Sequence, residues 1–172
     1  MTAPTVSKGL IEWASKAGYA FTREDDSGAA IFWSNPGGEI RYYLRTDRGG
    51  GITLTSAERG SAEQFEIFTC SVNAMERYLL PIIGIDLRSK KGLRRIKTPR
   101  TIEEVAEGYR VGEADSEGYR NLYFPSGEVA ARSRGRTNSI PTLTELSHFL
   151  QASEADLRNS YEDPDGRPLF ET

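Results

Sequence analysis

Apolar residues at the start of the chain repeat with the period of an α-helix. Thr5 precedes this stripe and is the expected N-cap, while Gly18 follows it, where a left-handed residue commonly ends a helix. The stripe lies on one helical face and consists of Val6, Leu10, Trp13 and Ala17. The sequence therefore predicts an amphipathic helix that ends at Gly18.

The pattern then changes to the twofold alternation of β-strands, interrupted by turn signals rich in Gly, Asn, Asp and Pro. Tyr19 and Phe21 begin the first strand, and further strands are expected over 29–34, 39–45 and 52–56. The alternation is clearest in 39–45, where Ile40, Tyr42 and Leu44 alternate with Glu39, Arg41, Tyr43 and Arg45. This alternation predicts a half-buried strand with one face exposed to water.

A second helical stripe predicts a longer helix over 62–80, with Pro81 ending or kinking it. The stripe consists of Phe65, Phe68, Val72, Met75 and Leu79, and it is expected to be core. Cys70 lies off this stripe and is expected to be a buried or partly buried small side chain.

The second half of the chain predicts a similar order of elements. Residues 84–100 form a basic connector, and Thr101 with Glu104 forms a capping box at the start of a short helix. Strands are expected over 109–113, 119–124 and 128–134, and an amphipathic helix begins at Thr142. Residues 163–166 are expected to belong to a loose tail.

The two halves are similar enough to suggest an internal repeat. In each half a short helix ends in Gly-Tyr, a Pro/Gly turn ends in Gly-Glu, and a helix follows the strands. The predicted fold is α+β, with antiparallel β-meanders packed with helices, and the repeat suggests two duplicated α-β-β-β-α units over 5–83 and 101–151. The alternative is that such patterns recur by chance, and in either case the repeat concerns fold and not activity.

Composition excludes several kinds of chemistry. The 172 residues include one cysteine and one histidine, so the chain has neither an internal disulfide nor a zinc site built from several Cys and His residues. No apolar run is long enough to span a bilayer, and the N-terminus shows no signal peptide. The unpaired cysteine and the lack of an export signal favour the reducing cytoplasm.

Catalytic motifs are equally absent. The glycines at 49–51 are not followed by a helix with Lys and Ser or Thr, so no phosphate-binding loop is formed. Paired carboxylates fall in turns or at a helix start, where they serve turn geometry or the helix dipole. His148 is expected to be solvated at the rim of the last helix. We therefore expect no enzyme activity, no metal and no cofactor.

Charge is concentrated locally, although the net charge is only −3. Seven cations occur within thirteen residues of the basic connector, without an acid among them: Arg88, Lys90, Lys91, Arg94, Arg95, Lys97 and Arg100. The connector is either a solvated linker or a surface that docks a protein. Nucleic acid is a less favoured partner, because the connector has no aromatic residue and the chain as a whole is acidic.

Arginine and tyrosine on the exposed face of strand 39–45 form a second candidate surface, because these residue types are enriched at binding hot spots. The alternative is that a helix covers this face. The candidate partner-binding residues are Arg41, Tyr43, Arg45 and Arg48, together with Arg88, Lys90, Lys91, Arg94 and Arg95 of the connector.

Three segments of the sequence resemble one family. The segments are IFWSNPGGEIRYYLR, MERYLL and LRSKKGLRRIKTPRTIEEVAEGY. Together they are similar to actinobacterial polymorphic-toxin immunity proteins, a family that includes the immunity factor for tuberculosis necrotizing toxin, an NAD-glycohydrolase. The resemblance extends from about Leu10 to Leu150.

The resemblance implies a single immunity-protein domain over 1–172 that acts as a cytoplasmic antitoxin. Such a protein would bind its cognate NAD-glycohydrolase toxin one-to-one and block the toxin's active site. It would be no enzyme, need no cofactor and have no membrane partner. The alternatives are another protein-binding adaptor or a secretion chaperone and, less favoured, a nucleic-acid binder.

Overall fold

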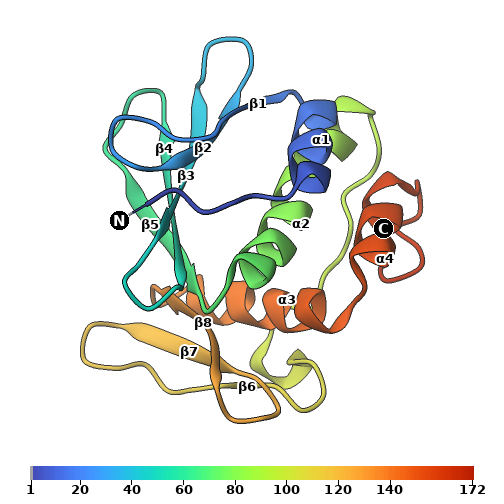
Figure 1. Cartoon of the computed structure of the whole chain (residues 1–172). Coiled ribbons are helices and arrows are strands. Elements are labelled where there is room, and N and C mark those ends of the chain that lie inside the picture. Colours follow the sequence, from blue (N-terminus) through green and yellow to red (C-terminus); the bar gives the residue numbers. More distant parts are fainter. Residues whose placement is uncertain (1) are drawn as a thin grey trace. The chain divides into compact units, whose positions relative to one another are not determined.

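The computed structural model describes residues 2–172, which form two compact units over 1–76 and 77–172 (Figure 1). Each unit combines an antiparallel sheet with helices. The predicted α+β class with antiparallel meanders is confirmed. The duplication over 5–83 and 101–151 and the single domain over 1–172 stay predictions.

The first unit begins with helix α1 (Lys8–Ala17), as the apolar stripe predicted. The prediction of Thr5 as its cap is wrong, because the Ser7 hydroxyl accepts the hydrogen bond from the Leu10 backbone N–H. Gly18 ends the helix at φ 95°, the left-handed conformation that favours glycine.

Five strands in the described part of the first unit form an antiparallel meander in chain order. Their bounds are β1 (Tyr19–Thr22), β2 (Ala30–Ser34), β3 (Ile40–Thr46), β4 (Ile52–Glu58) and β5 (Gln64–Thr69). One sheet face supplies much of the core, through Phe32, Leu44, Ile52, Leu54 and Ile67, each at most 1% exposed. The side chains of Leu10 and Trp13 on α1 are equally buried.

The helix predicted over 62–80 is wrong in its first part. Residues 64–69 form strand β5, and helix α2 (Val72–Lys90) begins only after it. The Phe65, Phe68 and Val72 spacing fits a helix, but Gln64 to Ile67 also alternate polar with apolar, and pairing with β4 selects the strand. Pro81 does not end α2, which continues for nine residues beyond it.

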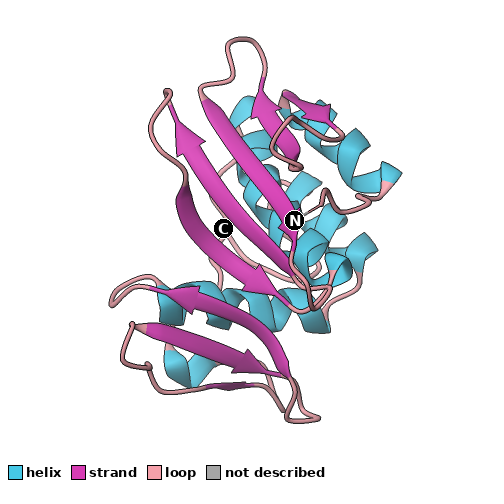
Figure 2. Cartoon of the chain, turned by 60° about the vertical axis from the view of Figure 1, so that its left-hand side comes forward, coloured by secondary structure: helices cyan, strands magenta, loops and turns pink. Residues whose placement is uncertain are grey.

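The second unit contains the rest of α2, a short 3-10 helix η1 (Ile102–Glu104) and a sheet in the order β8-β7-β6. Its strands are β6 (Arg110–Val111), β7 (Tyr119–Tyr123) and β8 (Val129–Arg134), and α3 (Ser139–Gln151) packs against all of them. The capping box forms, since the Glu104 carboxylate accepts from the Thr101 N–H at 2.9 Å. Figure 2 shows the strands of this sheet as adjacent arrows.

The C-terminal region contains a helix that the sequence analysis missed. Residues Glu154–Glu162 form α4, capped by the Ser153 hydroxyl, which accepts from the Asp156 N–H. Leu157 and Tyr161 of this helix are buried, at 0% and 2% exposure. The sequence predicted no element over 154–162, and the loose tail expected over 163–166 begins only after this helix.

Gly84 allows α2 and α4 to approach closely. A Cβ at Gly84 would lie 2.5 Å from Cδ1 of Tyr161, closer than carbon atoms pack. Alanine is favoured over glycine within a helix by about 1 kcal/mol, but overpacking a core costs about 1–3 kcal/mol. Because the Tyr161 ring is buried, we expect the overpacking to prevail and Gly84→Ala to lower the free energy of unfolding by up to about 2 kcal/mol.

Chemical denaturation followed by circular dichroism measures this effect. Ser89→Ala is the matched control, because Ser89 is exposed on the same helix and its substitution should change stability by less than about 0.5 kcal/mol. A Gly84→Ala variant more stable than the wild type would show that α4 does not pack on α2 at this glycine.

Candidate partner-binding surfaces

The three predicted residues of β3 lie together on the outer face of the first unit's sheet. In the antiparallel register, Arg41, Tyr43 and Arg45 stand opposite Ala57, Thr55 and Thr53 of β4. Arg41 is exposed, and Tyr43 and Arg45 are half-buried. The face turned to the viewer in Figure 2 carries no helix of this unit, so the predicted wet face is present.

Arg45 is held in place by partners within its own unit. Its Nη1 and Nη2 lie 2.6 Å and 3.0 Å from the Glu63 carboxylate oxygens, and its guanidinium stacks 5.3 Å from the centre of the Tyr43 ring. This hydrogen-bonded ion pair raises the pKa of Arg45 and lowers the pKa of Glu63. Arg45 therefore holds the Tyr43 ring in place, and Glu63 balances much of its charge within the unit.

Aromatic residues extend this outer face beyond the predicted set. Trp33 of β2 stands opposite Arg41, and Phe68 of β5 stands opposite Thr53, both half-buried. Phe68 was missed because the sequence analysis placed it in a helix. Arg48 is exposed in the loop after β3.

The basic connector is not one continuous loop. Helix α2 extends to Lys90, so residues 84–90 are helical and the irregular segment begins at Lys91. Lys90, Lys91, Arg94 and Arg95 are exposed. Two of them pair with the acidic C-terminal region, since Lys91 Nζ lies 3.6 Å from Glu162 and Arg94 Nη2 lies 3.9 Å from Asp165.

Arg88 does not lie on the surface, in contrast to its place among the candidate partner-binding residues. It is 2% exposed, and burial lowers the pKa of its guanidinium. Its nitrogens donate to the backbone carbonyls of Arg94, Ser160, Tyr161, Asp163 and Pro164. The helical period of α2 turns this side chain toward α4, so Arg88 holds the fold together and is not available to a partner.

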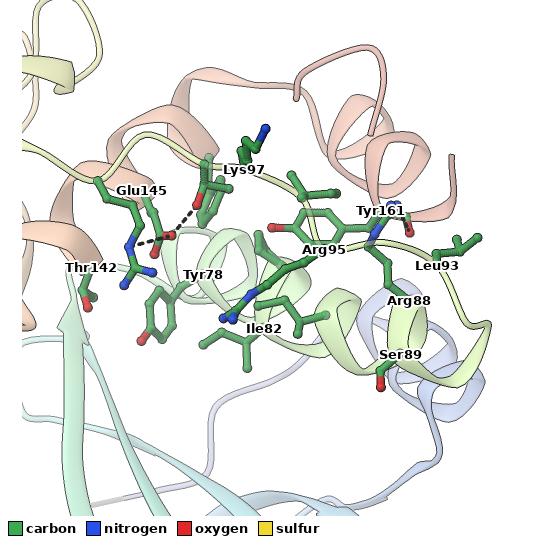
Figure 3. Close-up of a pocket in the computed structure, with 16 residues that line it drawn as sticks. Tyr78, Ile82, Arg88, Ser89, Leu93, Arg95, Lys97, Thr142, Glu145 and Tyr161 are labelled. Atoms are coloured by element: carbon green, nitrogen blue, oxygen red, sulfur yellow. Dashed lines mark hydrogen bonds and ion pairs between the residues drawn. The ribbon is translucent and has the colours of Figure 1, made fainter. Parts of the chain in front are cut away.

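A groove of about 750 Å³ lies along the connector in the second unit (Figure 3). Apolar side chains from α2, the connector and α3 line it, among them Ile82, Ile85, Leu93, Ile96 and Phe149. Arg95, Lys97 and Arg100 add positive charge. Glu145 is already engaged, because it accepts from the Thr98 hydroxyl and lies 3.7 Å from Arg100 Nε.

A Tyr/Arg face on the sheet of the second unit was also missed. The guanidinium of Arg132 lies 4.2 Å from the Tyr119 ring centre, and that of Arg110 lies 4.1 Å from the Tyr123 ring centre. Asp115 lies at the edge of this face. Its pKa is lowered mainly by the hydrogen bond from the Tyr119 N–H and, to a smaller extent, by the one from Arg132. Two-residue alternation in 119–123 could have revealed the face, since Tyr119, Asn121 and Tyr123 share one side of β7.

The residues considered for catalysis, His148 and Cys70, are ordinary surface residues in the structure. His148 Nε2 lies 2.6 Å from the Glu104 carbonyl oxygen, a hydrogen bond that joins α3 to η1. Cys70 is exposed, so its expected burial is wrong. Over residues 2–172, no group of three or more His, Cys, Asp or Glu side chains is arranged to hold a metal ion. None of the helices in this range is long and apolar enough to cross a membrane.

Comparison with known proteins decides the family. The model of Immunity protein 61 matches residues 13–169. The chain belongs to the Immunity protein 61 family. It is 33% identical over 170 residues to the immunity factor for TNT of Mycobacterium tuberculosis, covering 96% of this chain and 92% of that protein. The homologue from Mycobacterium bovis matches equally well.

A solved structure agrees with this assignment. The Immunity protein 61 chain superposes on Rv3902c from M. tuberculosis with a TM-score of 0.86 at 31% identity, covering 96% of this chain and 94% of the other. The predicted membership of a toxin-immunity family that includes the immunity factor for TNT is therefore confirmed.

Proposed function

We propose that this immunity protein is an antitoxin that binds a cognate NAD-glycohydrolase toxin one-to-one in the cytoplasm and blocks the toxin's active site. The observation that carries the proposal is the relationship to the immunity factor for TNT over nearly the whole length of both proteins. In this proposal the chain is an inhibitor and not an enzyme, and it needs no cofactor, membrane or nucleic acid.

The surfaces of the chain are consistent with a binding role. An inhibitor needs rigid, exposed side chains of the types that carry binding energy, and charge complementary to its target. The exposed Arg41 and Arg48, with the half-buried Tyr43 and Arg45 of β3, provide one such surface. The exposed connector cations Lys90, Lys91, Arg94 and Arg95 provide another. We propose Lys90, Lys91 and Arg95, together with the β3 surface, as toxin contacts, while Arg94, which pairs with Asp165, contributes long-range attraction.

Co-expression tests the binding step. A tagged form of this chain should co-purify with the catalytic domain of the toxin encoded beside it, and the complex should have the mass of one copy of each. Capture of an unrelated secretion substrate in place of a toxin would favour the chaperone alternative. Retention of DNA or RNA with a steep loss of affinity in salt would favour nucleic-acid binding.

A further inference from the structure

The groove along the connector contains a cation that the fold does not use. Arg95 makes no hydrogen bond or ion pair with any residue in the described chain. Figure 3 shows its side chain extending over Ile82 toward Tyr78, into the groove. Arg94, next to it in sequence, pairs instead with Asp165 and does not line the groove.

The groove also brings several partly exposed apolar side chains together. Ile85 is 44% exposed, more than the other exposed large hydrophobic residues of the described chain, Ile102 and Val129. Ile82 and Leu93, which are half-buried, continue this apolar floor. An apolar floor bordered by polar groups has the arrangement of a protein interface, which combines an apolar centre with a polar rim.

The charge around the floor is unbalanced. Lys97 and Arg95 both contribute positive charge at the rim, while the carboxylate of Glu145 is already shared between Thr98 and Arg100. An occupant with carboxylates would therefore complete the charge balance, and a second cationic surface would be repelled. The Glu145 contacts also hold α3 and the connector in place before binding. Less free energy is therefore needed to order the groove when a partner binds.

We propose that this groove receives a segment of the toxin that places an apolar side chain on Ile82 and Ile85 and a carboxylate against Arg95. The inference rests on the proposed function and specifies which part of the connector meets the toxin. In this proposal Arg95 contacts the toxin directly, whereas Arg94 contributes only long-range electrostatic attraction.

Two variants and one matched control test the groove. Arg95→Glu and Ile85→Glu should each weaken binding to the purified toxin catalytic domain by at least about tenfold, since buried Arg and apolar anchors dominate interfaces. Arg94→Glu makes the same charge change one residue away and should change the dissociation constant by less than about threefold. Arg95→Lys, which keeps the charge, should retain more affinity than Arg95→Glu. Dissociation constants from titration calorimetry measure these effects, and matched melting curves establish that each variant is folded.

The outcomes separate the groove from the proposed function. If the wild type binds the toxin and both groove variants bind it equally well, the groove assignment is overturned while the antitoxin function stands. If Arg94→Glu loses as much affinity as Arg95→Glu, the connector acts by general charge and the groove assignment is again wrong. A wild type that does not bind the toxin would overturn the proposed function, and the groove assignment with it.

Discussion

Arg88→Met should lower the free energy of unfolding by about 3–5 kcal/mol, because several backbone carbonyls lose their donor and each buried group left unsatisfied costs about 1–3 kcal/mol. Methionine keeps the length and apolar stem of the side chain but removes every donor. The carbonyls of Ser160 and Tyr161 in the last turn of α4 would then lose their hydrogen bonds while buried. The last carbonyls of a helix have no partner within it, so Arg88 supplies both donors and the positive charge that a helix C-terminus favours.

Denaturation followed by circular dichroism measures the Arg88 effect. Both tryptophans, Trp13 and Trp33, lie in the first unit, so tryptophan fluorescence would report on the wrong part of the chain. Arg94→Met is the control, because its side chain is 77% exposed and its loss should cost less than about 1 kcal/mol. An Arg88→Met variant within 1 kcal/mol of the wild type would refute the anchoring role.

Trp13→Ala should lower the free energy of unfolding by a similar amount, about 3–5 kcal/mol, because it removes buried apolar area and leaves a cavity. Trp13 is 1% exposed and lies on the same face of α1 as the fully buried Leu10. Its truncation removes the largest side chain that α1 contributes to the core of the first unit.

Thermal and urea denaturation measure the Trp13 effect. Trp13→Phe should lose less stability, because the smaller ring still fills part of the space. Lys8→Ala on the exposed side of α1, where the side chain is 91% exposed, should change the free energy of unfolding by less than about 0.5 kcal/mol. An unchanged melting temperature for Trp13→Ala would show that Trp13 is not core.

Elements that depend on local signals were predictable from the sequence. The period-two alternation of Ile40, Tyr42 and Leu44 identified β3 and its buried side, and Gly18 marked the end of α1. Short hairpins need only local turns, which Gly, Pro and Asn specify. For this reason most of the antiparallel strands were found.

Elements that depend on distant partners were not predictable. Residues 64–69 fit both periods, and only pairing with β4 makes them a strand. Helix α4 is short and polar on average, and its stability depends on burying Leu157 and Tyr161. Low intrinsic helical preference is commonly overcome by such packing.

The candidate binding surfaces were also predictable where they depend on a local pattern and not where they depend on distant contacts. Arg41, Tyr43 and Arg45 could be grouped because they alternate along one strand. Charge density alone could not tell the connector cations apart. Arg88 faces α4, Arg94 pairs with Asp165, and Arg95 lines the groove. Their different roles follow from the path of the connector, which no local pattern specifies.

We propose that this chain neutralises an NAD-hydrolysing toxin. NAD hydrolysis by the purified catalytic domain of the cognate toxin, titrated with this chain, measures this neutralisation. Hydrolysis should fall in proportion to added chain and stop at one equivalent. Undiminished NAD hydrolysis in the presence of a large molar excess of the folded chain would contradict it.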